Sequence, residues 1–190
     1  MNLVLASASP RRADLLRAAG FTFEILPVSV DERLLPGEQP SEAVSRLAEV
    51  KATAAAAARP ETVVLGADTA VVIGGQVLGK PADGADARRM LRLLSGQSHE
   101  VLTGICLLMG HRRLVHVETS RVRMAPLNEA EIAWYVSTGE PSDKAGGYAV
   151  QGLGSRFIDR IDGSYSNVVG LPISSLYTLM KELGCAILAV

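Results

Sequence analysis

Residues 63–73 constrain the fold more than any other part of the sequence, because this run is apolar apart from Asp68 and Thr69. Its length and its valine and isoleucine content are typical of a buried strand. Burying a lone carboxylate costs on the order of several kcal/mol unless a cation, a metal ion or hydrogen-bond donors meet it. A chain that keeps Asp68 there either neutralises the charge in a structural pair or uses it in chemistry, and the run alone favours neither.

The composition indicates a globular protein without a strong charge bias. The chain has 190 residues, is 48% hydrophobic and carries a formal net charge of −1. This length suits one moderate domain or two small lobes, and we expect a single domain over residues 1–190. A near-neutral chain lacks the basic face of a general nucleic-acid binder, so no nucleic-acid partner is expected.

Export and membrane signals are not expected either. The apolar start at residues 1–6 is too short for a signal peptide, and no apolar stretch is long enough to span a bilayer. Cys106 and Cys185 lie in apolar contexts without CxxC spacing, so we expect buried thiols rather than a disulfide or metal ligands. These features predict a cytoplasmic protein with no membrane partner.

Strands and helices are expected to mix without a strict βαβ rhythm. Strands are predicted at residues 2–6, 21–26, around Asp68, 101–109, 114–124 and 185–190, with turns at Gly74-Gly75 and Gly110-His111. Helices are predicted from Pro10 after an N-cap at Ser9, from an N-cap at Ser41 to the alanine run before Pro60, over residues 85–94, after an Asn128–Glu131 capping box, and after Pro172. The sequence therefore predicts an α/β or α+β protein with a mixed sheet and a cleft.

The segment Ser7-Ala8-Ser9-Pro10-Arg11-Arg12 lies where the first strand meets the first helix. A helix N-terminus carries positive partial charge and free N–H groups, and it therefore attracts anions. Two arginines in the first turn oppose this dipole, and local rules tend to be broken at functional sites. The segment is predicted to bind phosphate without being a P-loop; a solvated basic turn is the structural alternative.

Two lysines and several acids complete the charged candidates. Lys51 follows the apolar spacing of its helix, which snorkelling of the ammonium to water would explain. Lys80 lies in Gly79-Lys80-Pro81 and alone would be a turn lysine. The acids are Asp31-Glu32, Asp68 and Asp83, the last most simply a helix cap. Because His99, His111 and His116 do not cluster, carboxylates of this kind suit Mg²⁺ or Mn²⁺ better than zinc.

Residues 143–152 form a glycine-dense segment that is a poor helix and a candidate binding loop. Glycines permit close approach of the backbone, and Lys144 offers a charge. The amide of Gln151 can both donate and accept, as recognition of a pyrimidine edge requires. A flexible glycine loop is the structural alternative.

Together these segments resemble the Maf family of nucleoside triphosphate pyrophosphatases along almost the whole chain. The resemblance rests on short motifs in order: Ser7 to Arg12, Asp31-Glu32, Arg46-Leu47-Ala48 with Lys51, Gly66-Ala67-Asp68-Thr69, Gly79-Lys80-Pro81, Ser95-Gly96, Thr103-Gly104, residues 143–152 and residues 163–172. The chain is similar to the dTTP/UTP branch, whose substrate-selecting positions are occupied here by Arg11, Thr69 and Gln151. Gly147 departs from the family pattern, which commonly has a slightly larger residue there.

The resemblance implies an elongated mixed β-sheet flanked by helices, with two lobes and a central cleft, as in Maf and ITPase-like proteins. It implies hydrolysis between the α and β phosphates with a divalent metal cation, Mg²⁺ or Mn²⁺. Asp68 would be the catalytic acid–base residue, and Asp68 and Glu32 would bind the metal. The phosphates would be bound by Ser7, Arg12, Lys51 and Lys80. Which carboxylate binds metal and which accepts the proton is left open by the sequence.

Other functions remain compatible with these residues. The family takes its name from septum formation, so the chain could act as a regulator of cell division through a protein partner. It could also be a house-cleaning enzyme for modified pyrimidine nucleotides. A homodimer is compatible with the sequence as well, in which Trp134-Tyr135 could belong to the core, an interface or the cleft rim.

Overall fold

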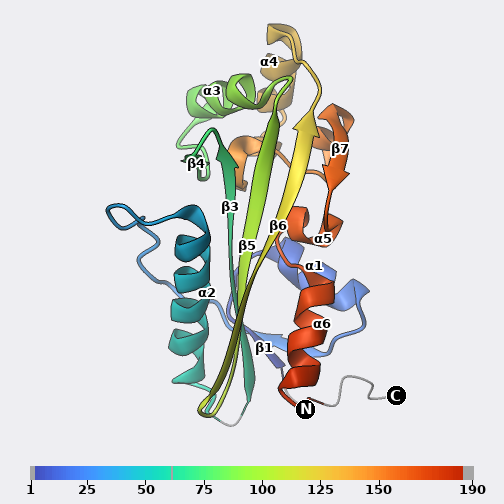
Figure 1. The fold of residues 1–190 in the computed structure, drawn as a ribbon. Coiled ribbons are helices and arrows are strands. Elements are labelled where there is room, and N and C mark those ends of the chain that lie inside the picture. Colours follow the sequence, from blue (N-terminus) through green and yellow to red (C-terminus); the bar gives the residue numbers. More distant parts are fainter. Residues whose placement is uncertain (1–2, 61, 186–190) are drawn as a thin grey trace. The chain divides into compact units, whose positions relative to one another are not determined.

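A computed structural model describes residues 3–60 and 62–185 of the protein, and its ribbon is drawn in Figure 1. Its α-helices are α1 (Pro10–Ala18), α2 (Pro40–Ala56), α3 (Gly84–Leu94), α4 (Glu129–Ser137), α5 (Tyr165–Val169) and α6 (Ile173–Glu182). Its strands are β1 (Leu3–Leu5), β2 (Phe23–Ile25), β3 (Val63–Ile73), β4 (Gln76–Leu78), β5 (Ser98–Met109), β6 (Arg112–Met124) and β7 (Ile158–Asp162). Three short 3₁₀ turns lie between α4 and β7, namely η1 (Glu140–Asp143), η2 (Ala145–Gly147) and η3 (Leu153–Phe157).

The strands of the described residues form one mixed sheet. Its order is β2-β1-β3-β5-β6-β7, with β4 paired to β3. Strand β1 pairs in parallel with β2 and β3, whereas β3–β4 and β6–β7 are antiparallel. The predicted turns at Gly74-Gly75 and Gly110-His111 join β3 to β4 and β5 to β6. The protein therefore has the mixed α/β architecture that the sequence predicts.

The chain divides into two compact units. Unit 1 comprises residues 1–68, 103–118 and 170–190, and unit 2 comprises residues 69–102 and 119–169. The three longest strands, β3, β5 and β6, pass from one unit into the other. Strand β3 leaves unit 1 after Asp68 and continues in unit 2 with Thr69. The expectation of a single domain over residues 1–190 stays a prediction.

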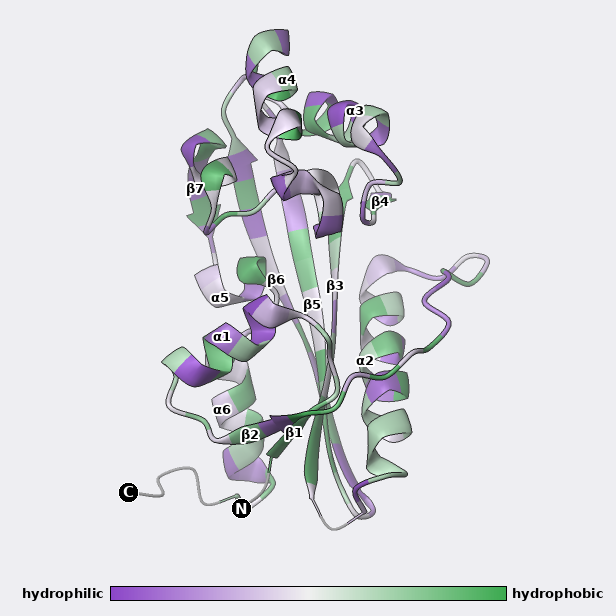
Figure 2. Ribbon diagram, turned by 180° about the vertical axis from the view of Figure 1, so that it is seen from behind, coloured by the Kyte–Doolittle hydropathy of each residue, from purple (hydrophilic) through white to green (hydrophobic). Residues whose placement is uncertain are grey.

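In unit 1 the apolar residues of the strands alternate between two faces of the sheet. One face packs on α1 and α6 and includes Leu3, Leu5, Val63, Leu65, Ile105 and Leu107. The other face packs on α2 and includes Val4, Ala6, Val64 and Cys106. Figure 1 shows α2 on one side of these strands and α1 and α6 on the other, and Figure 2 shows the hydrophobic colour of the strands between them. Strands covered on both faces explain the continuous apolar runs of the sequence.

Helix α2 lies unusually close to the sheet. A Cβ atom at Gly66 of β3 would collide with the Ala48 carbonyl oxygen and lie 2.6 Å from the Ala52 nitrogen. A Cβ atom at Gly104 of β5 would meet the backbone of Val44 in the same way. Glycine at both positions thus allows the helix backbone to touch the strands.

Unit 2 has its own core on the other parts of the long strands. Helices α3 and α4 contribute Met90, Leu91, Leu94, Ile132 and Tyr135, and the strands contribute Val71, Leu78, Val101, Val122 and Met124. Tyr148, Val150 and Phe157 of the segment after α4 complete this cluster. The glycine-dense segment is therefore anchored in a core.

Several predicted elements differ from the structure. Helix α2 begins at Pro40, not after a cap at Ser41, because proline suits the first helical position and the Glu42 carboxylate accepts from the Gln39 N–H at 3.0 Å. Strand β7, helix α5 and the 3₁₀ turns were not predicted. The predicted strand at residues 185–190 lies outside the described residues except for Cys185. The caps at Asp83 and Asn128 are confirmed.

Candidate active site

Lys51 of α2 brings two of the predicted carboxylates together in unit 1. Its Nζ lies 2.7 Å from Asp68 Oδ1 and 2.6 Å from Glu32 Oε1. The side chains of Lys51 and Asp68 are 8% and 16% exposed, whereas that of Glu32 is 54% exposed. Snorkelling is therefore the wrong interpretation of Lys51: the ammonium stays buried because it neutralises the carboxylate in β3.

The close packing of α2 on β3 explains this contact. Gly66 lies two residues before Asp68, and Ala48 and Ala52 flank Lys51 along the helix. The small residues at all three positions let the two backbones touch. The motifs Gly66-Ala67-Asp68 and Arg46-Leu47-Ala48 with Lys51 are thus two halves of one packing arrangement, which sets the distance between the ammonium and the carboxylate.

Arg46 fixes the loop that carries Glu32. Its Nε and Nη2 donate to the two carboxylate oxygens of Glu38 at 2.6 and 2.8 Å, and Nη2 also donates to the Arg33 carbonyl at 3.1 Å. The bidentate pair lowers the pKa of Glu38 to about 2. Arg46 belongs to one of the motifs in the sequence, which assigns it no role. The structure shows that it holds the loop of Glu32 through Glu38 and the Arg33 carbonyl.

Arg12 is buried in unit 1 and joins three segments. Its Nη1 donates to Ser7 Oγ at 3.0 Å and to the Ala67 carbonyl at 2.9 Å, and its Nε donates to the Gly170 carbonyl at 2.9 Å. Burial lowers the pKa of Arg12, and the charge of Asp68 opposes this shift. A solvated basic turn is therefore the wrong interpretation for Arg12. Arg11, its neighbour in the first turn of α1, is half-buried.

The remaining predicted residues lie in unit 2. Thr69 follows Asp68 in β3 and is half-buried, whereas Lys80 and Gln151 are exposed. The Gly146 N–H donates to the Gly79 carbonyl at 3.0 Å, which brings the turn of Lys80 beside the glycine-dense segment. Gly146 has a φ of +70° and a Cβ atom there would lie 3.0 Å from Val71, so glycine is required on both counts.

The glycine-dense segment is ordered by two residues that the sequence analysis did not select, Tyr135 and Glu140. The Tyr135 hydroxyl donates to Glu140 Oε1 at 2.7 Å and accepts from the Ala149 N–H at 3.0 Å. Tyr135 belongs to the core, whereas Trp134 is partly exposed. The sequence signal for this arrangement was the pair of glycines at positions 152 and 154, because glycine is favoured where a side chain closely approaches the backbone.

Asp68 and Glu32 are the candidate ligands of a divalent cation. Among residues 3–60 and 62–185, no group of three or more His, Cys, Asp or Glu side chains is arranged to hold a metal ion. The two carboxylates nevertheless converge on one cationic group, Lys51 Nζ. Mg²⁺ is commonly bound by one or two carboxylates together with substrate phosphates and water. The donor set therefore fits Mg²⁺ or Mn²⁺.

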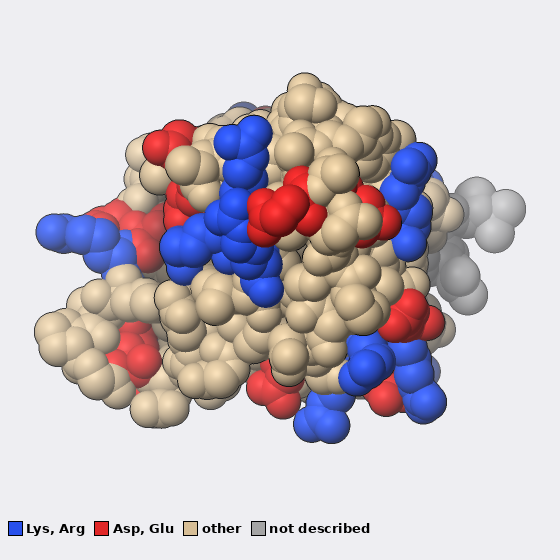
Figure 3. Space-filling view, turned by 90° about the horizontal axis from the view of Figure 1, so that it is seen from above, with Lys and Arg blue, Asp and Glu red and all other residues tan. Residues whose placement is uncertain are grey.

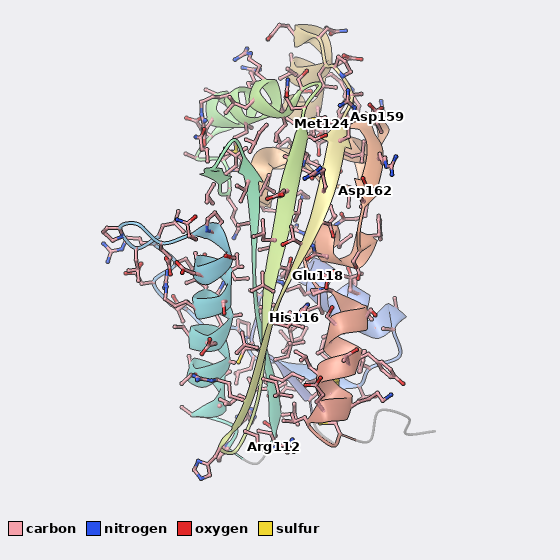
Figure 4. The ribbon with its side chains drawn as sticks, in the orientation of Figure 1. Arg112, His116, Glu118, Met124, Asp159 and Asp162 are labelled. Carbon is pink, nitrogen blue, oxygen red and sulfur yellow. The ribbon has the colours of Figure 1, made fainter. Side chains whose placement is uncertain are left out.

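The histidines and cysteines behave as structural or surface residues. His99 is buried, with its Nε2 2.7 Å from the Tyr148 hydroxyl. His116 Nε2 lies 3.1 Å from Glu118 Oε2, and Figure 4 labels both residues along β6. Cys106 and Cys185 are free and buried.

On the face shown in Figure 3, several Lys and Arg side chains gather in one cluster beside acidic side chains, and much of the remaining surface is uncharged. None of the described helices combines the length and the apolar character needed to cross a membrane.

Comparison with known proteins gives a consistent result. A family model described as "Maf-like protein" matches residues 2–183. A protein of Koribacter versatilis named "dTTP/UTP pyrophosphatase" is 52% identical over 184 residues, which cover 97% of this chain and 95% of that protein. A protein of Anaeromyxobacter dehalogenans strain 2CP-C with the same name is 53% identical over 186 residues, covering 96% and 94% of the two chains.

The fold is also found in a solved structure. The Staphylococcus aureus Ham1 protein matches 96% of this chain and 100% of its own chain with a TM-score of 0.53 at 15% identity. A likeness at this level of identity shows the fold alone. The mixed sheet with flanking helices that the sequence predicts is thus part of a fold that this chain shares with the Ham1 protein.

Proposed function

Because the chain belongs to the Maf family, we propose that it is a nucleoside triphosphate pyrophosphatase that hydrolyses dTTP and UTP. The products are the nucleoside monophosphate and pyrophosphate. The observation that carries the proposal is the contact of Lys51 with Asp68 and Glu32 in a chain 52% identical to a relative named for this activity.

In the proposed reaction, Asp68 accepts a proton from the attacking water, whose oxygen forms a bond to the α-phosphorus. The bond from the α-phosphorus to the bridging oxygen breaks, and its electron pair leaves with pyrophosphate. The Lys51 ammonium, 2.7 Å from Asp68 Oδ1, orients the carboxylate. A divalent cation such as Mg²⁺ or Mn²⁺, held by Asp68 and Glu32, would supply Lewis acidity at the phosphate oxygens.

The phosphates are assigned to Ser7, Arg12, Lys51 and Lys80. Positive charge that is fixed before substrate binds is the main source of catalysis in phosphoryl chemistry, because no reorganisation is needed during the reaction. Arg12 contributes its charge from a buried position, where its bonds to Ser7 and to the Ala67 carbonyl also hold the residues around Asp68.

Arg11, Thr69 and Gln151 are assigned to selection of the base. The amide of Gln151 has the donor and the acceptor that a uracil or thymine edge requires. We expect Gln151→Glu to weaken pyrimidine selection more than it weakens hydrolysis, because a carboxylate only accepts hydrogen bonds. The ratio of kcat/KM for dTTP to that for dGTP, measured in both proteins, checks this.

A substrate panel tests the proposal. Pyrophosphate release is measured from canonical and modified nucleoside triphosphates with Mg²⁺, with Mn²⁺ and with a chelator. Metal-dependent release from dTTP and UTP, with the monophosphate as the second product, is the expected result. Release from modified pyrimidine nucleotides alone would reassign the substrate, and no release from any triphosphate would overturn the activity. A cytoplasmic location and a homodimer stay predictions, the second open to sedimentation.

A further inference from the structure

Gln151 lies in a segment of unit 2 whose backbone is held by two side chains, the buried Tyr135 and the half-buried Glu140. The Glu140 carboxylate accepts from the Leu153 N–H through Oε2 at 2.9 Å and from the Gly154 N–H through Oε1 at 3.0 Å. Oε1 also accepts from the Tyr135 hydroxyl at 2.7 Å. The same hydroxyl accepts from the Ala149 N–H at 3.0 Å. Backbone donors on both sides of Gln151 are thus tied to two side chains.

The glycines beside Gln151 fit these two side chains closely. A Cβ atom at Gly152 would lie 2.7 Å from the carboxyl carbon of Glu140, and one at Gly154 would lie 2.6 Å from the Tyr135 hydroxyl. No larger residue could occupy either position without moving the carboxylate or the phenol. The sequence of the segment is therefore matched to Glu140 and Tyr135.

Tyr135 is itself rigidly placed. It is fully buried in the core of unit 2, and its ring packs edge-to-face on Phe157 with the ring centres 5.4 Å apart. Glu140 begins η1 directly after Gly139, whose φ is +76°. The Lys144 ammonium donates to the Glu140 carbonyl at 2.8 Å, which fixes the backbone beneath the carboxylate.

From these contacts we infer that Glu140 and Tyr135 are positioning residues for Gln151, and that they set the selection of pyrimidine nucleotides without touching the substrate. The segment presents an exposed Gln151 between anchored neighbours. A recognition amide must be held in place before substrate binds, because an amide that moves loses both its geometry and its discrimination. The inference rests on the proposed function and adds to it the residues that orient its specificity group.

The test uses Glu140→Gln and Tyr135→Phe in the full chain. In Glu140→Gln an NH₂ group replaces one of the two acceptor oxygens. It then faces an N–H or O–H donor, so at least one of the hydrogen bonds to Glu140 is lost. In Tyr135→Phe the Ala149 N–H and Glu140 both lose their hydroxyl partner, while the ring and its packing remain. Glu129→Gln is the matched control, since Glu129 is an exposed carboxylate of the same unit, paired with Arg92 at 2.7 Å.

The readout is the ratio of kcat/KM for dTTP to that for dCTP, which differ at the base edge. We expect the ratio to fall about tenfold in both variants, mainly through the KM for dTTP, and to be unchanged in Glu129→Gln. In a Gln151→Ala background the same substitutions should leave the ratio unchanged, because the group they orient is gone. Thermal unfolding of each variant accompanies the kinetics.

Failure of the inference and failure of the proposed function give different results. If the wild-type protein prefers dTTP and the ratio of kcat/KM for dTTP to that for dCTP is unchanged in both variants, Glu140 and Tyr135 have only a structural role and the inference is overturned. This holds also where hydrolysis of dTTP and of dCTP falls in equal proportion. If the wild-type protein hydrolyses no nucleoside triphosphate, the proposed function fails and the inference fails with it.

Discussion

At the scale of single residues, the largely buried carboxylate of Asp68 in β3 is explained by its partner. Asp68 lies in an apolar strand, and Lys51 Nζ neutralises it at 2.7 Å. Removing Lys51 leaves the Asp68 carboxylate without this cation, which costs more than the pair itself contributes, whereas removing Asp68 leaves Lys51 paired with Glu32 at 2.6 Å. The same contact gives the site a carboxylate of fixed orientation, so the structural and functional interpretations of Asp68 describe one arrangement.

This pairing predicts strong coupling between the two residues. Lys51→Met should lower the free energy of unfolding by about 1.5 to 3 kcal/mol, because it leaves the Asp68 carboxylate without its cation. Asp68→Asn should lower it by less, because Lys51 keeps its ion pair with Glu32. The double variant should be more stable than the sum of the two losses implies. Urea unfolding at pH 7 measures all four proteins. Additive losses would show that the pair does not interact.

His99 predicts a pH dependence of stability. Its ring is buried against Tyr148, and its Nδ1 has no hydrogen-bond partner in the described structure. Burial lowers the pKa of His99 to about 4 from 6.5. In the unfolded chain His99 is protonated as the pH falls through 6.5, whereas in the folded chain it is protonated only near pH 4. The free energy of unfolding therefore decreases as the pH falls from about 6.5 to about 4.

The wild-type protein should accordingly lose on the order of 3 kcal/mol more stability between pH 7 and pH 4 than His99→Gln does. Glutamine has no titrating group there, whereas every other ionisable group is common to both proteins. Unfolding free energies across the pH range check this, and parallel curves for the two proteins would mean that His99 does not carry the effect.

At the scale of elements, the sequence predicts those whose signals are local. The proline at the start of α1, the capping box of α4 and the Asp83 cap of α3 act within a few residues. Strand β7 and helix α5 are short and are stabilised by distant partners such as β6 and Val101. A pattern within one segment does not contain such partners, which is why these elements were not predicted.

The candidate site was predictable to a similar extent. Local sequence rules disfavour polar or charged residues at several candidate positions, which indicates a functional site. These residues are Ser7, Arg12, Lys51 and Asp68. The bonds of Arg12 to Ala67 and Gly170 join residues that are 55 and 158 positions apart. The roles of Tyr135 and Glu140 likewise depend on contacts that no short motif shows.

The packing of α2 on β3 leads to an element-scale prediction. Gly66→Ala should lower stability by about 1 to 3 kcal/mol and reduce activity, because its methyl group would push α2 and therefore Lys51 away from Asp68. Gly84→Ala is the matched control. Gly84 is the first residue of α3, and a methyl group there would make only an ordinary contact of 3.5 Å with Val136 of α4. Thermal unfolding and kcat/KM are measured for both. Equal effects in the two variants would contradict a special role for the close approach at Gly66.

At the scale of the whole molecule, the predicted residues are divided between the two units. Ser7, Arg11, Arg12, Glu32, Lys51 and Asp68 belong to unit 1, and Thr69, Lys80 and Gln151 belong to unit 2. The proposed catalytic carboxylate is thus the last residue of unit 1 in β3, and a specificity residue is the first residue of unit 2. Each unit contributes to both assignments, because Arg11 of unit 1 is assigned to base selection and Lys80 of unit 2 to the phosphates.

The two cysteines report on the integrity of unit 1. Cys106 packs against α2 and Cys185 against α6, on opposite faces of the sheet. Burial raises the pKa of the Cys106 thiol to about 12. Both thiols should stay unreactive toward a thiol reagent at pH 8 and react together when the protein unfolds. Rapid reaction of either cysteine in the native protein would show that this core opens locally.

The most direct test of the central claim is pyrophosphate release from dTTP by the wild-type protein, Asp68→Asn and Asp83→Asn. Asparagine caps a helix as well as aspartate does, so Asp83→Asn controls for the chemical change alone. We expect Asp68→Asn to keep the fold, judged by circular dichroism, and to lose turnover by roughly 10² to 10⁴, with Asp83→Asn near the wild type. Full activity in a folded Asp68→Asn protein would contradict the assignment of Asp68 as the group that accepts the proton.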